Sequence, residues 1–188
     1  MSGYLLDANV LITPHKQYYP FDFAPSFWDQ LANVLRRKDA AILRVVSKEI
    51  LNKMNDSLSE WLKEIKEDIK IPSVERNQKV YDNYALVLQY IQTCGFYTNT
   101  ALLNWARDGV ADPWLIATAM DNGYKIVTNE QPSGNLSRKN LQNNPKIPDV
   151  AKHFHVQCIS LFDFMRAMNF RRTRYATFFT KCHKASCP

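Results

Sequence analysis

Short apolar runs alternate along the chain with longer segments whose apolar residues recur at helical spacing. The short runs are typical of strands buried on both faces, and the longer segments are typical of helices packed on them. We expect strands over 4–6, 40–46, 124–128 and 156–160. We expect helices from about Ser26 and over 47–54, 58–69, 83–94, 100–109, 111–123, 147–154 and 161–168, with a polar loop over 129–146.

Capping and stop signals mark the ends of several of these helices. Asp112 is expected to be an N-cap, with Pro113 at the first helical position and Gly123 after the end of the same helix. Gly95 and Gly109 are expected to end two earlier helices. Strands separated by helices predict an α/β fold, a three-layer α/β/α sandwich with a mainly parallel central sheet.

The acidic residues give this fold a candidate site. Asp7 ends the first strand, Glu49 lies early in the helix after the second, Asp112 begins the helix before the third, and Glu130 follows Thr128 where the third strand ends. In a parallel sheet these positions meet at the carboxyl edge, where α/β proteins bind their ligands. Taken singly, the four acids are explained as a turn residue, a first-turn acid, a helix cap and a loop residue. Packed together they would repel one another, and Mg²⁺ or Mn²⁺ would relieve that repulsion.

Length and composition bound the class of protein. A chain of 188 residues with 46% hydrophobic content suits one domain, expected over 1–168, followed by a basic tail over 169–188. No apolar run approaches the roughly 18 residues of a membrane span, and the N-terminal residues do not resemble a signal peptide. The scattered cysteines favour a reduced cytoplasm, and Cys182, His183 and Cys187 lack the further ligand of a structural zinc site.

The net charge of +6 is concentrated at the C-terminus. After Asp163 there are six basic residues and no acid, and without these six the chain has 18 basic against 18 acidic residues. Basic residues interleaved with aromatic ones suit contacts to a nucleic-acid backbone and its bases. The predicted contacts are Arg171, Arg172, Arg174 and Lys181. A solvated tail, or an arm that docks on an acidic protein, explains the same pattern and stays open.

Four segments in order, YLLDANVLI, VSKEIL, ADPWLIATAM and IVTNE, resemble the PIN-domain nucleases, the group that includes the VapC-type toxins. The segments YYPFDFAPSFWDQL and KIPDVAKHFHVQCISLFDFMR further resemble one branch of PIN-like proteins known mainly from genome sequence. The resemblance covers about Tyr4 to Met168. It implies a three-layer α/β/α fold and metal-dependent endoribonuclease activity on RNA. Many members are toxins neutralised by an antitoxin, so an antitoxin protein is an expected partner, and a homodimer is common in the family.

The resemblance also implies roles for particular residues. Asp7, Glu49 and Asp112 match the first three acids of the family, which act as catalytic metal ligands. Asn9 matches the polar residue that helps to order the site, and Thr128 matches the threonine of the fourth motif. The expected reaction is in-line hydrolysis of a phosphodiester with one or two Mg²⁺ or Mn²⁺ ions.

Two further acids fit less simply. Glu130 stands where the family usually has Asp, and its longer side chain would bind a metal directly or through water. Asp149 either supports the site or caps a helix. Four histidines match no motif and are expected at the surface or in packing, and Trp61 and Trp114 are expected in the core; the histidines are His15, His153, His155 and His183.

Two rival functions share some of these features. A phosphatase of the haloacid dehalogenase type also places Asp at the end of its first strand, but it needs a second Asp where this chain has Asn9. A non-catalytic PIN-like module that binds RNA or protein would keep the fold, and the departure at Glu130 keeps this alternative open. Within the nuclease interpretation, the residues do not separate a toxin from an RNA-processing enzyme.

Overall fold

The computed structural model of the protein describes residues 3–53, 56–72 and 77–171. Within these residues four short parallel strands form one sheet in the order β2-β1-β3-β4. The strands are β1 (Tyr4–Leu6), β2 (Ala40–Ala41), β3 (Lys125–Val127) and β4 (Cys158–Ile159). The helices are α1 (Asn9–Gln17), α2 (Pro25–Arg36), α3 (Arg44–Lys53), α4 (Ser57–Ile65), α5 (Gln78–Thr93), α6 (Asn99–Trp105), α7 (Asp112–Asn122), α8 (Ile147–His153) and α9 (Leu161–Ala167).

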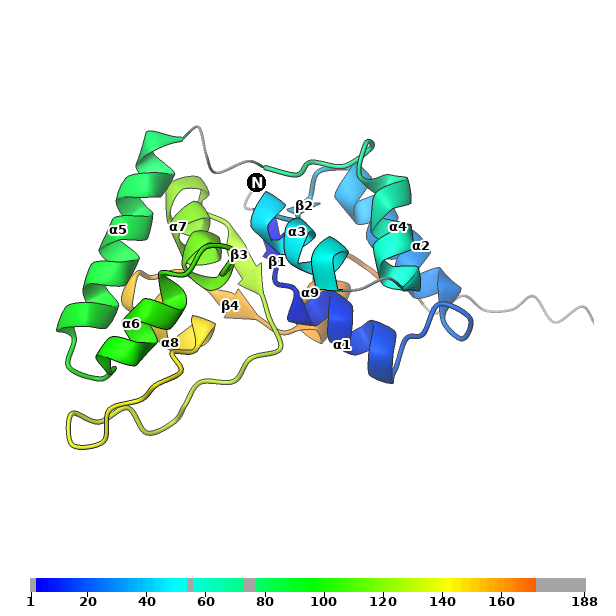
Figure 1. The fold of residues 1–188 in the computed structure, drawn as a ribbon. Helices are drawn as coiled ribbons and strands as arrows, with labels where there is room; N and C mark the ends of the chain where they lie inside the picture. Colours follow the sequence, from blue (N-terminus) through cyan, green and yellow to red (C-terminus); the bar gives the residue numbers. More distant parts are fainter. Residues whose placement is uncertain (1–2, 54–55, 73–76, 172–188) are drawn as a thin grey trace, which may run out of the picture.

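The sheet lies between two groups of helices (Figure 1). Helices α5 to α8, in green and yellow, gather on one side, and helices α1 to α4, in blue and cyan, gather on the other. The register places Leu5 beside Ala41 of β2 and Ile126 of β3, and all three residues are buried. Strands covered on both faces need apolar side chains throughout, which explains the short apolar runs in the sequence. The predicted α/β fold with a parallel central sheet is confirmed.

An aromatic cluster fills the core on the side of α2 and α4. The rings of Phe21 and Trp28 stack with their centroids 4.2 Å apart, and Trp61 meets Trp28 edge-on at 5.1 Å. Trp61 therefore packs in the core as expected. Trp114 is only partly buried and stacks on Tyr84 of α5 at 3.9 Å. Its place is the contact between α5 and α7 rather than the core of the sheet.

The second strand is much shorter than predicted. It ends at Ala41, and α3 begins at Arg44, so Val46 lies on a helix and not at the end of a strand. The residues Ile42, Leu43 and Val46 are all fully buried. An apolar run this short, interrupted only by the exposed Arg44, has no period that separates a buried strand from the first turn of a buried helix.

Helix α1 was not expected from the sequence. It begins at Asn9, two residues after Asp7, and it contains Pro14. Its buried residues, Val10, Leu11 and Pro14, have helical spacing, but the segment reads equally well as a continuation of the first strand. Because α1 starts so early, the carboxylate at the end of β1 lies at the N-terminal end of a helix.

Two other helices differ from the prediction at their ends. The helix predicted over 83–94 begins earlier, at Gln78, because the side chain of Asn77 accepts a backbone hydrogen bond and acts as its N-cap. The helix predicted over 100–109 already ends at Trp105. None of the helices in the described ranges is long and apolar enough to cross a membrane.

Candidate active site

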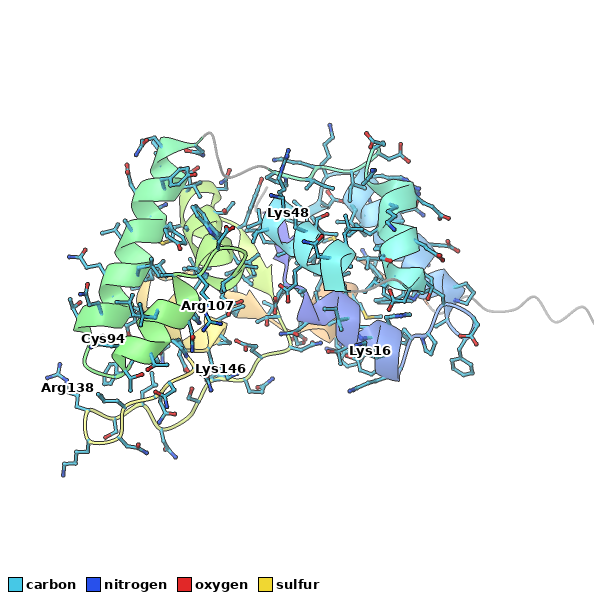
Figure 2. The ribbon with its side chains drawn as sticks, viewed as in Figure 1. Lys16, Lys48, Cys94, Arg107, Arg138 and Lys146 are labelled. Carbon is cyan, nitrogen blue, oxygen red and sulfur yellow. The ribbon has the colours of Figure 1, made fainter. Side chains whose placement is uncertain are left out.

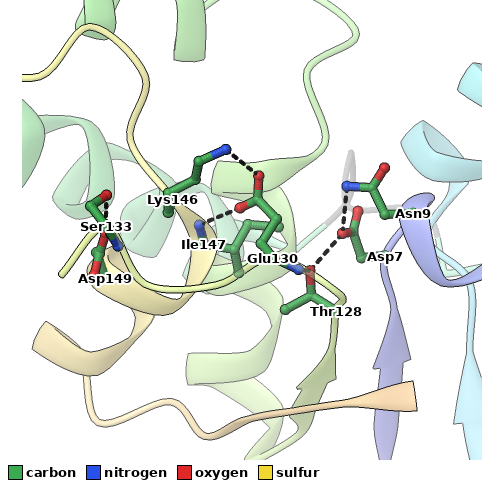
Figure 3. A network of polar contacts seen from close by, with 8 residues as sticks. All are labelled: Asp7, Asn9, Thr128, Glu130, Ser133, Lys146, Ile147 and Asp149. Atoms are coloured by element: carbon green, nitrogen blue, oxygen red, sulfur yellow. Dashed lines mark hydrogen bonds and ion pairs between the residues drawn. The ribbon is translucent and has the colours of Figure 1, made fainter. Parts of the chain in front are cut away.

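Asp7 lies at the carboxyl end of β1, and its side chain is almost completely buried, with 3% of the residue exposed. Its backbone N–H still donates to the carbonyl of Val127 at 3.0 Å, so the β1–β3 ladder holds its position. The carboxylate oxygen Oδ2 accepts hydrogen bonds from the Thr128 hydroxyl at 2.8 Å and from the Asn9 side-chain amide at 3.3 Å (Figure 3). Asn9 and Thr128 therefore hold this carboxylate in one orientation.

The Thr128 hydroxyl links two of the predicted acids. It donates its proton to Asp7 and accepts the backbone N–H of Glu130 at 3.1 Å. The hydroxyl thus donates one hydrogen bond and accepts another. These two bonds fix its rotation and direct its proton at the carboxylate of Asp7. These hydrogen bonds connect the turn after β3 to the end of β1.

Burial works against the charge of Asp7. It raises the pKa of this carboxyl to about 6, and the negative charges of Glu130 and Glu49 add to the effect, while the hydrogen bonds from Thr128 and Ala8 oppose it. Hydrogen bonds to the ionised form are therefore not enough to offset its desolvation and the nearby acids.

Asp112 begins α7, on a different element of the fold. It is the first helical residue, and Ala111 is the N-cap, so the prediction that Asp112 caps this helix is wrong. The helix ends as expected, with Gly123 in the left-handed conformation at φ 65°. The hydrogen bonds among the described residues do not include the Asp112 carboxylate, which leaves its oxygens available for a ligand at the positive end of α7.

The electrostatics of Asp112 show that the predicted acids converge. Burial is the largest cause that raises its pKa to about 7, and the charges of Asp7, Glu130 and Glu49 raise it further, in that order, whereas Lys146 lowers it. Charges act on a pKa through space over distances up to roughly 10 Å, so the three other acids lie in the neighbourhood of Asp112. The structure therefore brings the four acids, from four separate segments, to one edge of the sheet.

Glu49 reaches this edge from α3, not from the end of a strand. It lies in the second turn of the helix and is partly buried, next to the buried Ile50. Its charge acts on both Asp7 and Asp112.

Glu130 is bound to groups on the far side of the site. One of its oxygens pairs with the Lys146 ammonium at 3.1 Å, and the other accepts the backbone N–H of Ile147, the first residue of α8, at 2.8 Å (Figure 3). In this arrangement Glu130 closes the long loop over 129–146 onto the start of α8. Its role as a metal ligand stays a prediction.

Asp149 lies farther along the same helix. It is in the first turn of α8 and is not the cap, because the N-cap is Lys146. Its carboxylate accepts the backbone N–H and the hydroxyl of Ser133, at 2.9 and 2.7 Å (Figure 3). Asp149 therefore supports the loop that carries Glu130.

The sequence did not point to Lys146. It lies sixteen residues beyond Glu130, at the end of a polar loop that has no regular spacing. Only the pairing of that loop with α8 shows that an ammonium group belongs to the site. Of the predicted nucleic-acid contacts, Arg171 is exposed, and its backbone exchanges hydrogen bonds with the side chain of Gln30 at 2.7 and 3.0 Å. The others, Arg172, Arg174 and Lys181, lie outside the described residues.

The four acids fit a hard divalent cation by the chemistry of their oxygens and by their mutual repulsion. Within the described residues, no three acidic, histidine or cysteine side chains are already arranged to hold a metal ion. Mg²⁺ keeps several waters and is usually bound by one or two carboxylates together with phosphates of the substrate, so two of these acids would be enough to hold it. Burial and the neighbouring charges raise the pKa of both Asp7 and Asp112.

The fold has known counterparts. Twelve chains of solved structures match, among them one from the crystal structure of VapBC2 from Rickettsia felis bound to a DNA fragment from their promoter. That match has a TM-score of 0.50 and 14% sequence identity, and it covers 84% of this chain and 97% of the other. The structure therefore has a PIN-like α/β fold.

Residues 4–172 match the DUF4411 family, described as a domain of unknown function. The chain belongs to this family. A search of curated proteins found no match.

Proposed function

We propose that the protein is a metal-dependent endoribonuclease of the PIN type. The observation that carries this proposal is the convergence of Asp7, Glu49, Asp112 and Glu130, because the three other acids all raise the pKa of Asp112. Repulsion of this kind is unfavourable for a fold that does not use it, and it is relieved by a bound cation. The PIN-like fold and the four sequence motifs support the same activity.

In this proposal Asp7 and Asp112 hold Mg²⁺ or Mn²⁺, Glu49 is a ligand or orients the attacking water, and Glu130 completes the second side. The ion supplies an acidified water and positive charge at the phosphate. Thr128 and Asn9 keep the Asp7 carboxylate in one orientation through their hydrogen bonds at 2.8 and 3.3 Å. A fixed carboxylate contributes most when the geometry of attack must be exact to within tenths of an ångström.

The biological setting that we propose is a cytoplasmic toxin–antitoxin pair, with RNA as substrate and an antitoxin protein as partner. The motif resemblance to VapC-type toxins and the fold shared with VapBC2 support this setting. A homodimer is compatible with it.

The alternative is a PIN-like module that binds RNA or protein without catalysis. Its support is Glu130, since both of its oxygens are already bonded, to Lys146 and to Ile147. The phosphatase of the haloacid dehalogenase type has less support. Asn9 occupies the position of the required general acid and donates a hydrogen bond to Asp7.

The test is cleavage of single-stranded and structured RNA by the purified protein, with Mn²⁺ or with EDTA. We expect cleavage only with Mn²⁺, and a loss of at least about 100-fold in Asp112→Asn, because one of the two main ligands is removed. Asp163→Asn is the matched control, since Asp163 is an exposed acid on α9 that pairs with Arg166. Equal rates for wild type and Asp112→Asn would refute the catalytic proposal, and RNA binding without cleavage would favour the alternative module. Hydrolysis of an aryl phosphate alone would favour the phosphatase.

A further inference from the structure

Each of the four acids has a basic residue that is paired with it or lies on a neighbouring part of the same segment. Lys146 pairs with Glu130 at 3.1 Å, and Lys48 is adjacent to Glu49 on α3. Arg107 lies in the turn between α6 and α7, just before Asp112. Lys16 lies in the last turn of α1, the helix that starts beside Asp7, and a helix of nine residues is about 13 Å long. We call these four residues, Lys16, Lys48, Arg107 and Lys146, the basic rim.

Figure 2 shows the basic rim on one face of the protein. Lys48 lies above the junction of β1 and α1, Arg107 and Lys146 lie on one side of it, and Lys16 lies on the other. Arg138, which is also labelled, lies away from the others at the outer end of the molecule. The rim comes from four separate segments, so no single helix face or local repeat explains it.

Three members of the rim have no acidic partner within the described residues. Lys16, Lys48 and Arg107 are exposed and take part in none of the ion pairs found there. Lys146 is paired with Glu130, but 41% of its side chain is exposed. Their charges are therefore available to a ligand that approaches the acids.

The chemistry of the site explains how cations around the acids would help a phosphate ligand to bind. Carboxylates gathered at one edge repel an approaching polyanion. Cations placed around the acids reverse the field that an approaching phosphate meets, without neutralising the carboxylates themselves. Because Asp7 is almost fully buried, a flexible single strand, whose phosphates can turn inward, suits the site better than a rigid duplex.

We propose that Lys16, Lys48 and Arg107 bind backbone phosphates of single-stranded RNA on either side of the bond held at the acids, with Lys146 as the innermost cation. The inference rests on the proposed function for the identity of RNA as the ligand. It assigns binding to the folded domain, in addition to the basic C-terminal segment predicted from the sequence.

The test is the affinity for a fluorescein-labelled single-stranded RNA of about 20 nucleotides, measured by anisotropy in EDTA so that no cleavage occurs. Lys16→Ala, Lys48→Ala and Arg107→Ala should each weaken binding about 3- to 10-fold at low salt. Each should also lower the slope of log affinity against log salt by about 0.7, the value for one contact to a single strand. Lys16→Arg keeps the charge and should bind as wild type does.

Arg138→Ala is the matched control, because it removes one exposed cation outside the rim and changes the net charge equally. We expect its RNA affinity and salt slope to equal those of wild type. All four sites are exposed, so each variant should melt within a few degrees of wild type. Unchanged affinity in the three rim variants, or an equal loss in Arg138→Ala, would overturn the proposal. A rim that serves an acidic protein would show the first result.

Cleavage assays separate this proposal from the proposed function. If no RNA is cleaved with Mn²⁺ while the rim variants still lose affinity, the proposed nuclease activity is refuted and the proposed RNA binding by the basic rim is supported. If RNA is cleaved and the rim variants keep the wild-type KM, the proposed RNA binding by the basic rim is refuted and the proposed nuclease activity is supported. Support for both requires a raised KM with a kcat close to that of wild type, because phosphates remote from the reacting bond contribute uniform binding.

Discussion

Replacing Asp7 with Asn is expected to stabilise the fold. Burial and the neighbouring acids raise the pKa of Asp7 from 3.8 to about 6, so at neutral pH the folded protein holds a carboxylate that prefers to be protonated. Above pH 6 this preference amounts to about 3 kcal/mol of lost stability, because each pKa unit corresponds to about 1.4 kcal/mol. Asn can keep the hydrogen bonds from Thr128 and Asn9, since both donate to the same oxygen and the amide oxygen can occupy that position.

The sign of the effect follows from the protons bound. Between pH 3.8 and 6 the folded state holds a proton on Asp7 that the unfolded state has released, so stability falls as pH rises through this window. Below it both states are protonated, and the charge contributes nothing. The gain from Asp7→Asn should therefore be small at pH 4, grow up to about pH 6 and then stay constant.

The assay is thermal unfolding in EDTA from pH 4 to pH 8. A domain of this size gains about 2–4 °C in Tm for each kcal/mol, so we expect Asp7→Asn to melt about 6–12 °C above wild type at pH 7.5 and within about 2 °C at pH 4. Asp163→Asn is a control of opposite sign, because the hydrogen bond from Ser160 lowers the pKa of that exposed carboxyl. It should lose stability at neutral pH. A lower Tm of Asp7→Asn at pH 7.5, or the same gain at pH 4, would refute the reasoning.

Three further predictions test neighbouring parts of the structure. Thr128→Val removes the donor to Asp7 and should lower stability at pH 7.5 by about 1–3 kcal/mol, with a smaller loss at pH 4, as measured by urea unfolding. Mn²⁺ should raise the Tm of wild type at pH 7.5 and leave that of Asp112→Asn unchanged, and an equal rise in both would place the ion elsewhere. A chain that ends after Met168 should have a free energy of unfolding about 1–3 kcal/mol lower than one that ends after Arg171, because it loses the packing of Phe170 on Phe27 and Phe164. Equal stability of the two chains would show that this packing contributes nothing.

The architecture was largely predictable because its signals are local. Leu5, Leu6, Ile126 and Val127 stand in short apolar runs next to polar residues, and each run forms a buried strand. The order of strands and helices then leads to a parallel sheet and places the ends of the strands together. Asp7 and Glu130 could be placed at one edge on this basis alone.

The errors lie where one residue pattern fits two structures. The run 40–46 is apolar except for the exposed Arg44, and one charged residue does not separate a strand from a helix, so the periodicity did not reveal that its second half belongs to α3. Val10 and Leu11 continue the apolar character of β1, which concealed the start of α1. For Asp112 the residue type suits both a cap and a first-turn acid, and Pro113 is accepted at either of the first two positions of a helix.

Contacts between distant segments could not be predicted at all. The pairing of Lys146 with Glu130, and that of Ser133 with Asp149, join residues across the long loop over 129–146. No spacing rule connects such positions, because the shape of the loop sets their distance. The same limit applies to the basic rim, whose members are unremarkable in sequence and meet only in the fold.

The strongest argument for a function at this edge is that the acids are unfavourable for the fold alone. A buried residue at the end of β1 that only had to accept hydrogen bonds from Thr128 and Asn9 could be Asn, without the cost of about 3 kcal/mol assigned to the charge of Asp7. Asp112 adds a second carboxyl with a raised pKa next to the first. Stability lost at one place is typical of sites that bind or react. A bound cation would recover that stability, so the same substitution that raises the melting temperature in EDTA should abolish both metal binding and cleavage.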